Sequence, residues 1–177
     1  MKKIIAFFIF NLIFLSSCYA ARIDGPYEGR VIDADTRQPI EGVVVLGVWY
    51  KEYPGAAGAI SKYHDAVETV TDKNGDFKIK GLGLQVIGNV LPVNVLIFKV
   101  GYEYESGYWT GLKKYKKKIK WEGEKAIIPL KKLTMEERKK RGTLSRPDIP
   151  VNKMELITKE INKERVEQGL KPFQIER

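Results

Sequence analysis

The side chains that most often carry out chemistry are scarce in this chain. His64 is its only histidine and Cys18 its only cysteine. A zinc site would have to combine His64 with carboxylates alone, and a nucleophile relay would need the same single imidazole. Glu103 and Glu105 are two residues apart, so on a strand they share a face and could form a carboxylate hydrolase site. We expect no catalytic site, no metal and no cofactor, and keep the carboxylate hydrolase as an alternative.

Aromatic side chains suggest a second kind of site, because their faces can pack on sugar rings. The chain contains nine tyrosines, seven phenylalanines and three tryptophans. The other interpretation is that Tyr102 and Trp109 fill positions in the core or at the end of the domain. The candidate glycan platform consists of Tyr102, Tyr104, Tyr108 and Trp109, with Tyr50 and Tyr53.

The N-terminus carries an export signal. Lys2 and Lys3 precede an apolar stretch that runs from Ile4 to Leu15. As a helix this stretch would span only about 18 Å, whereas the apolar layer of a bilayer is roughly 30 Å thick. The pattern predicts a secretory signal peptide at residues 1–17 and not a membrane-spanning helix.

The sequence Leu-Ser-Ser-Cys at residues 15–18, across the end of the signal peptide, resembles the lipobox of bacterial lipoproteins. The resemblance implies cleavage before Cys18 and acyl chains on its thiol, each buried CH₂ contributing about 0.8 kcal/mol to membrane binding. Tyr19 is not the Asp associated with inner-membrane retention, so we expect the periplasmic face of the outer membrane. The alternative is cleavage after Ala20, which would release a soluble periplasmic protein.

A dense run of cations contributes to the formal net charge of +9. Export argues against nucleic acid as its partner, so anionic lipid head groups or acidic envelope polymers are the candidate ligands. The alternative is a solvated edge hairpin that its charges protect from aggregation. The run consists of Lys113, Lys114, Lys116, Lys117, Lys118 and Lys120, with Tyr115 and Trp121 among them.

These residues must be positioned by strands, because short alternating segments with turn signals between them predict an all-β sandwich over residues 27–133. Residues 18–26 are a tether before it. We expect a loop from Lys51 to Ser61, a tight hairpin at Asn74-Gly75 and a connection from Gly81 to Pro92. The expected strands are Tyr27–Asp33, Glu41–Tyr50, Tyr63–Asp72, Asp76–Lys80, Val93–Val100 and Ala126–Leu130.

The second expected strand is apolar on both faces. A half-exposed strand would alternate apolar with polar residues, so this one must be covered on each side. One face holds Val43, Val45 and Trp49, and the other holds Val44, Leu46, Val48 and Tyr50.

Three motifs in order along the chain resemble carboxypeptidase regulatory-like domains. The first runs from Gly29 to Asp33 and continues from Gln38 to Val45, the second is Thr71-Asp72-x-x-Gly75-x-Phe77-x-Ile79, and the third is Gly101-Tyr102 after an apolar strand. The resemblance implies a transthyretin-like sandwich of about seven strands, usually an accessory module that spaces or binds. Hydroxyisourate hydrolases, the enzymatic relatives, use several histidines and a terminal Tyr-Arg-Gly-Ser, which this chain lacks.

Residues 134–177 form a charged tail with two expected helices. Thr134 and Glu137 fit a capping box for the first. Asn152 is the expected N-cap of the second, and Gly169 its end. Met154, Ile157 and Ile161 recur at helical spacing, and we expect this stripe to cover the outer face of the second strand.

Together these patterns predict a lipid-anchored accessory protein of the bacterial envelope with no enzymatic activity. Its expected partners are the membrane, through Cys18, and another envelope protein. The alternatives are a carbohydrate-binding module and the carboxylate hydrolase.

Overall fold

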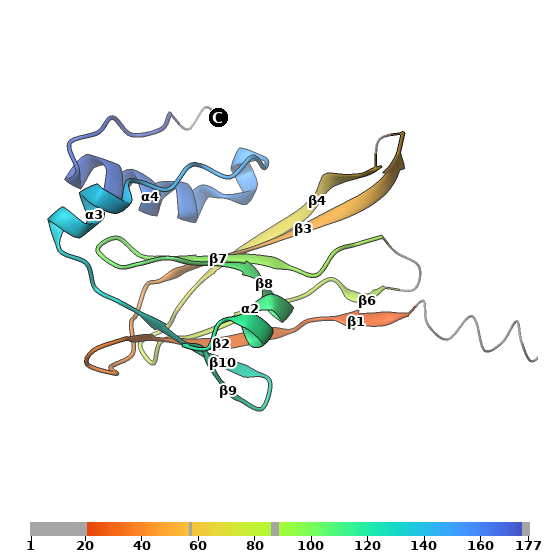
Figure 1. The fold of residues 1–177 in the computed structure, drawn as a ribbon, viewed down its shortest axis with the longest axis horizontal. Coiled ribbons are helices and arrows are strands. Elements are labelled where there is room, and N and C mark those ends of the chain that lie inside the picture. Colours follow the sequence, from red (N-terminus) through yellow and green to blue (C-terminus); the bar gives the residue numbers. More distant parts are fainter. Residues whose placement is uncertain (1–20, 57, 86–88, 175–177) are drawn as a thin grey trace, which may run out of the picture.

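The computed structural model describes residues 21–56, 58–85 and 89–174, and Figure 1 shows its fold. The expected signal helix and Cys18 lie outside these residues. As predicted, most of the secondary structure is strand, and the strands form three sheets. The strands are β1 (Arg22–Asp24), β2 (Tyr27–Asp33), β3 (Val44–Gly55), β4 (Gly58–Val70), β5 (Asp76–Ile79), β6 (Gly83–Gln85), β7 (Asn94–Phe98), β8 (Glu105–Tyr108), β9 (Lys120–Glu122) and β10 (Lys125–Leu130).

Two four-stranded sheets pack face to face as a sandwich. One has the order β5-β2-β10-β9 and the other β4-β3-β7-β8. Their facing side chains form one apolar cluster, the inner core, in which Val31 and Ile128 come from the first sheet. Val45, Trp49 and Ile97 come from the second sheet, and all five are fully buried.

The small third sheet pairs β1 with β6, and we call it the ribbon. It lies inside the stretch expected to be a tether, so the chain is already folded from Arg22 onward. Gly83–Gln85 likewise adds a strand to the expected connection between Gly81 and Pro92.

The expected tight hairpin at Asn74-Gly75 is wrong. β4 pairs with β3, whereas β5 pairs with β2 in the opposite sheet, so this turn crosses from one sheet to the other. Gly75 has φ +74, and a Cβ there would collide with the carbonyl oxygen of Val31. The turn therefore needs glycine, but its sequence does not say which strands it joins.

β3 and β4 form a long antiparallel hairpin that continues past the sandwich (Figure 1). The expected loop from Lys51 to Ser61 is therefore wrong, because residues 51–55 extend β3 and residues 58–61 extend β4. β7 pairs with β3 from Val44 to Val48, and the segment before β7 continues to bond to β3 as far as Glu52, through a bridge between Lys51 and Val90. Pro54 lies beyond these bonds, so its missing N–H removes none of them. We call residues 51–56 and 58–62 the arm.

The tail packs on the outer face of β3, as predicted. It contains α3 (Met135–Arg141), the short 3₁₀ turn η1 (Val151–Lys153) and α4 (Glu155–Glu167). No helix in the described part of the chain is long and apolar enough to cross a membrane. Met154, Ile157 and Ile161 pack against Val44, Leu46, Val48, Ala66, Phe98 and Ile149, and we call this cluster the outer core.

The helix ends follow the sequence at two places and depart from it at a third. The capping box at Thr134 and Glu137 is present, and Gly169, with φ +81, follows the end of α4 at Glu167. Asn152 is not the N-cap of α4, since it lies in η1. Instead the amides of Leu156 and Ile157 donate to the Glu68 carboxylate of β4, at 2.9 and 2.7 Å.

Buried ion pairs accompany the outer core. The guanidinium of Arg138 binds Glu164 through two hydrogen bonds of 3.0 and 2.8 Å, and Arg141 adds a third at 2.7 Å. Burial by itself raises the pKa of Glu164, but Arg138 and the Gly101 amide more than offset this and lower it. Glu164 therefore stays ionised while fully buried, and the ion pairs join α4 to α3.

Candidate functional site

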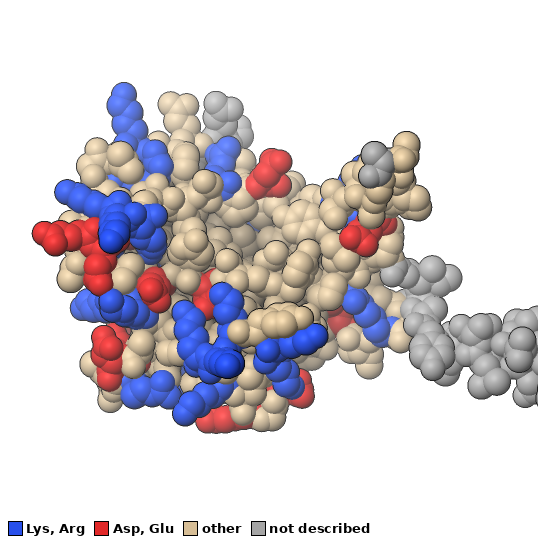
Figure 2. All heavy atoms as spheres, viewed as in Figure 1, with Lys and Arg blue, Asp and Glu red and all other residues tan. Residues whose placement is uncertain are grey.

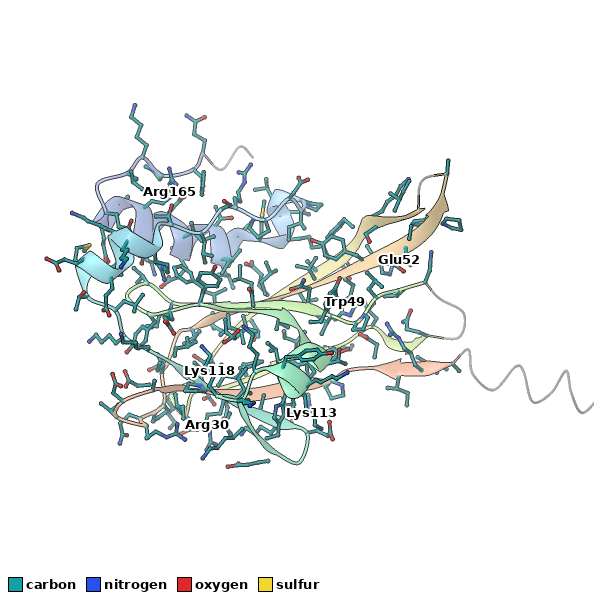
Figure 3. The ribbon with its side chains drawn as sticks, viewed as in Figure 1. Arg30, Trp49, Glu52, Lys113, Lys118 and Arg165 are labelled. Carbon is teal, nitrogen blue, oxygen red and sulfur yellow. The ribbon has the colours of Figure 1, made fainter. Side chains whose placement is uncertain are left out.

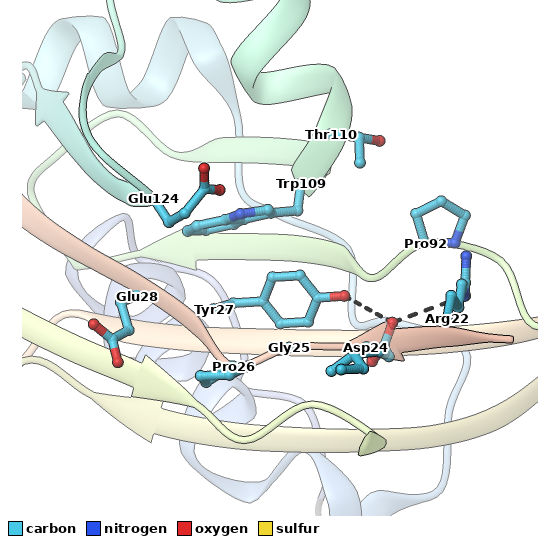
Figure 4. A pocket seen from close by; sticks show the side chains of 11 residues that line it. Arg22, Asp24, Gly25, Pro26, Tyr27, Glu28, Pro92, Trp109, Thr110 and Glu124 are labelled. Atoms are coloured by element: carbon cyan, nitrogen blue, oxygen red, sulfur yellow. Dashed lines mark hydrogen bonds and ion pairs between the residues drawn. The ribbon is translucent and has the colours of Figure 1, made fainter. Parts of the chain in front are cut away.

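An open cavity of about 650 Å³ lies where β1 leads into the sandwich (Figure 4). Tyr27 and Trp109 are its aromatic side chains, and their rings meet edge to face with centroids 5.5 Å apart. Trp109 opens the short helix α2 (Trp109–Tyr115), which follows β8 directly. Pro26, Pro92 and Thr110 also line the cavity, and its charged residues are Arg22, Asp24, Glu28 and Glu124.

Asp24 connects the cavity to the inner core. Its Oδ1 accepts from the Tyr27 hydroxyl at 2.7 Å and lies 3.8 Å from the Arg22 guanidinium. Its Oδ2 accepts from the Trp49 indole N–H at 2.8 Å and from the Leu82 amide at 3.0 Å. With both oxygens satisfied and 4% of the residue exposed, Asp24 positions β1 against the core and does not serve as a free base.

The other polar groups of the cavity are also paired. Burial raises the pKa of the Tyr27 hydroxyl, and the neighbouring Asp24 raises it further, so Tyr27 remains a hydrogen-bond donor. Glu28 pairs with Lys78 at 2.7 Å and Glu124 with Lys113 at 3.2 Å. The Glu28 and Glu124 side chains are paired but stay 45% and 91% exposed, so their oxygens can still accept hydrogen bonds from a ligand. Tyr27 and Trp109 supply aromatic contacts.

The expected glycan platform is not assembled as one surface. Trp109 is 7% exposed and packs in the inner core, and Tyr102 packs against the same cluster. Tyr104 is exposed beside the Arg141 guanidinium, 6.0 Å from its ring centre. Tyr108 is exposed elsewhere, in a shallow hollow that it shares with Tyr115. The prediction fails because these side chains come from different places: Tyr102 and Tyr104 precede β8, Tyr108 ends it, and Trp109 opens α2 with its ring in the inner core.

The lysine run is divided between structural pairs and a solvated surface. The expected edge hairpin is wrong for its first half, because Lys113 and Lys114 belong to α2. Lys116 and Lys118 bind the buried Glu105 at 2.7 and 3.0 Å. Figure 3 shows Lys113 and Lys118 around α2 and β9. Among the described residues, no ion pair forms at the remaining three, Lys114, Lys117 and Lys120.

Glu103 and Glu105 do not form the acid–base pair that the hydrolase alternative requires. The Glu105 side chain is 2% exposed. Burial by itself raises its pKa, but Lys116 and Lys118 more than offset this and lower it. Glu103 is only the more distant partner of Lys118, at 3.7 Å. Glu105 is therefore an ionised counter-ion that fixes the chain after α2.

His64 is exposed at the irregularity where the pairing of β3 and β4 shifts its register, next to Tyr50. Within the described ranges, no three His, Cys, Asp or Glu side chains are grouped so that they could hold a metal. The Asp72 carboxylate accepts instead from the amides of Asn74 and Asp76, which shapes the turn.

Sequence reasoning missed Asp24 and Glu68, two of the carboxylates that join distant segments. Neither belongs to a local motif, because Asp24 meets Trp49 and Leu82, and Glu68 meets the start of α4. The one local signal near Asp24 is the Gly25-Pro26 pair that follows it, which marks a sharp change of direction.

Comparisons with known proteins give no assignment. No model of a known family matches the chain, and a search of the curated proteins finds no match. Among solved structures, the chain is similar to 3-chlorocatechol 1,2-dioxygenase from Rhodococcus opacus 1CP, with 15% identity, 61% of this chain covered and a TM-score of 0.34. The match spans 59% of the dioxygenase chain, and a score this low carries no argument about fold or activity.

Proposed function

We propose that this protein is a lipid-anchored accessory protein of the bacterial cell envelope that binds another envelope protein and catalyses no reaction. The observation that carries the proposal is the short connection between Cys18 and the sandwich. β1 begins at Arg22, and Asp24 joins it to Trp49 in the inner core. A lipid on Cys18 would therefore hold the folded domain within about 14 Å of the bilayer surface, the length of four extended residues.

The proposed cellular location is the periplasmic face of the outer membrane. It is supported by the short apolar leader, by Cys18 at the end of a lipobox-like sequence and by Tyr19 in place of Asp. The finer classification as a transthyretin-like, carboxypeptidase regulatory-like sandwich is also part of the proposal. Its support is the order of the three motifs and the shared core of two four-stranded sheets.

The surface around α2 and β9 is the candidate binding face for the partner. Lys114, Lys117 and Lys120 are exposed there, and Tyr115 is 70% exposed. Figure 2 shows basic side chains gathered over this lower part of the molecule. An acidic surface on the partner fits this chemistry, because exposed lysines steer oppositely charged surfaces together.

Crosslinking in intact cells tests this proposal. We expect one envelope protein to be recovered with the wild type and lost with Cys18→Ser. Joint substitution of Lys114, Lys117 and Lys120 by Glu should also reduce its recovery. The matched control replaces three exposed lysines outside this surface, by Lys73→Glu, Lys139→Glu and Lys159→Glu, and should leave recovery unchanged. Recovery of no protein with any form would end the partner hypothesis.

Glycan binding is the second candidate function, because the cavity beside Trp109 combines two aromatic rings with exposed carboxylates. Trp109→Ala is a poor test, since it removes a core side chain. Glu124 is a better choice, because its side chain is 91% exposed. If the cavity binds glycan, Glu124→Ala should weaken retention on insoluble glycan without changing the melting temperature. The exposed Glu136→Ala is the control, and equal retention of wild type and Glu124→Ala would reject the cavity.

A further inference from the structure

We propose that one end of the molecule touches the bilayer through two separate apolar pairs, Ile23 with Leu84 on the ribbon and Tyr53 with Ile60 on the arm. The inference rests on the proposed lipid anchor, which brings this end to the membrane. The two pairs would give the sandwich two separate points of contact with the bilayer. These contacts would fix its orientation relative to the membrane, which a flexible anchor alone cannot do.

The first pair is exposed on a sheet that has only two strands. Ile23 and Leu84 are 78% and 64% exposed, and they lie directly opposite each other in the antiparallel register. Side chains at opposite positions of an antiparallel pair point to the same side. Asp24, the next residue of β1, holds the ribbon in place through its bond to the Leu82 amide. Two large aliphatic side chains are therefore held side by side and exposed on a ribbon whose position is fixed.

The second pair, near the far end of the arm, is likewise two exposed side chains at opposite positions of an antiparallel pair of strands. Tyr53 and Ile60 are opposite each other in the register of β3 and β4, and they are 43% and 52% exposed. The sequence has no charged residue between Glu52 and Lys62. Lys62 places its ammonium 5.6 Å from the centre of the Tyr53 ring. An aromatic ring with a flanking lysine is typical of residues at a membrane–water interface.

Both pairs lie at the same end of the molecule. In Figure 1 the arm and the start of β1 reach the right-hand end of the long axis, apart from one another. Figure 2 shows mostly uncharged atoms at this end, whereas the basic side chains gather at the left and below. A flat surface at this end can therefore meet both pairs at once.

Together with the proposed anchor, the short length of chain before β1 favours lipid as that surface. Arg22 is the fourth residue after Cys18, so an acylated Cys18 keeps Arg22 within about 14 Å of the site of acylation. The head-group layer on each side of a bilayer is roughly 5–8 Å thick. Ile23 is thus within reach of the boundary between head groups and acyl chains, where interfacial apolar side chains insert about 5–10 Å.

Photo-crosslinking to lipid tests the contact. The photoreactive residue p-benzoylphenylalanine is placed singly at positions 23, 60 and 84 of the full chain, and lipid adducts in isolated membranes are measured by mass spectrometry. The matched control is position 166, because Val166 is 60% exposed and lies near the end of α4, away from the arm. We expect lipid adducts at positions 23, 60 and 84 and no lipid adduct at position 166. Equal labelling at all four positions, or no adduct at 23 and 84, would overturn the contact.

The anchor and the contact can be tested independently. The intact mass of the purified protein shows whether Cys18 is acylated in cells, and an unmodified thiol would refute the proposed anchor. The chain from Cys18 onward, coupled through that thiol to a maleimide lipid in phosphatidylcholine vesicles, then tests the same four positions. Adducts there at 23, 60 and 84 but not at 166 support the contact surface even if the cell does not acylate Cys18.

Discussion

The sheet β4-β3-β7-β8 buries both of its faces, but the two faces are buried differently. Toward the opposite sheet, Val45 and Trp49 enter the inner core, whose members are apolar side chains. Toward the tail, Val44 enters the smaller outer core, next to which Glu164 and Arg138 are buried as ions. Carboxylates are buried beside both cores, but Asp24 and Glu105 bind groups of the sandwich itself, whereas Glu164 joins the two tail helices and accepts from the Gly101 amide. Ion pairs therefore organise the tail that covers the outer face.

The largest expected effect comes from breaking the inner core. Trp49→Ala should lower the free energy of unfolding by about 3–5 kcal/mol, because it opens a large cavity. It also removes the indole donor from the buried Asp24. Urea unfolding followed by circular dichroism measures the loss. Tyr115→Ala is the control, since Tyr115 is 70% exposed and should change stability by no more than about 0.5 kcal/mol.

The next effect comes from breaking the ion pairs beside the outer core. Arg138→Met should lower the free energy of unfolding by about 3 kcal/mol, because it leaves the buried Glu164 with one guanidinium in place of two. The same urea titration applies. Adding Glu164→Met to that variant should restore most of the stability, because the buried carboxylate is then gone and Arg141, which loses its partner Glu164, keeps its hydrogen bond to the Tyr102 carbonyl. If the double variant is as unstable as the single one, the ion pair is not the cause.

A third prediction compares the two faces at adjacent positions. Val45→Ala should lower the free energy of unfolding by about 2 kcal/mol, from two lost methyl groups and a small cavity. Val44→Ala should lower it less, because the tail can undock as a local unit. Hydrogen exchange should show the α4 amides losing protection first in Val44→Ala. Equal global losses with unchanged α4 protection would mean that tail and sandwich unfold together.

The smallest effect tests the cap of α4. Glu68→Gln should cost about 1 kcal/mol, because the neutral amide is a weaker acceptor for the Leu156 and Ile157 amides. Asn152→Ala should change stability by no more than about 0.5 kcal/mol, since Asn152 is not the cap. Thermal melts of the two variants at one pH make the comparison. A larger loss for Asn152→Ala would favour the cap that the sequence predicts.

The burial of β3 on both faces and the docking of the tail were predictable from the sequence. Both depend on local periodicity: apolar residues on each side of one strand, and Met154, Ile157 and Ile161 at helical spacing. The predicted lipid site at Cys18 depends on a local pattern too, but it lies outside the described residues and remains a prediction.

The arm and the cavity could not be predicted in the same way. Pro54, Gly55 and Gly58 usually mark a loop, but beyond Glu52 the two strands of the arm pair with each other and need no buried face. The turn at Asn74-Gly75 was identifiable, while its crossing between sheets depends on β2, a partner more than forty residues away. Asp24 has no local signal, because its partners are distant in sequence.

The position of β2 has a mechanical consequence. It lies between β5 and β10, and it directly follows the ribbon where the chain enters the domain. A pull on the N-terminus acts along β2, so it must shear the ladders on both sides together, because their hydrogen bonds run across the strand. Such a load is shared among many bonds at once and does not open them one at a time. The sandwich is thus suited to withstand tension applied at its N-terminal end.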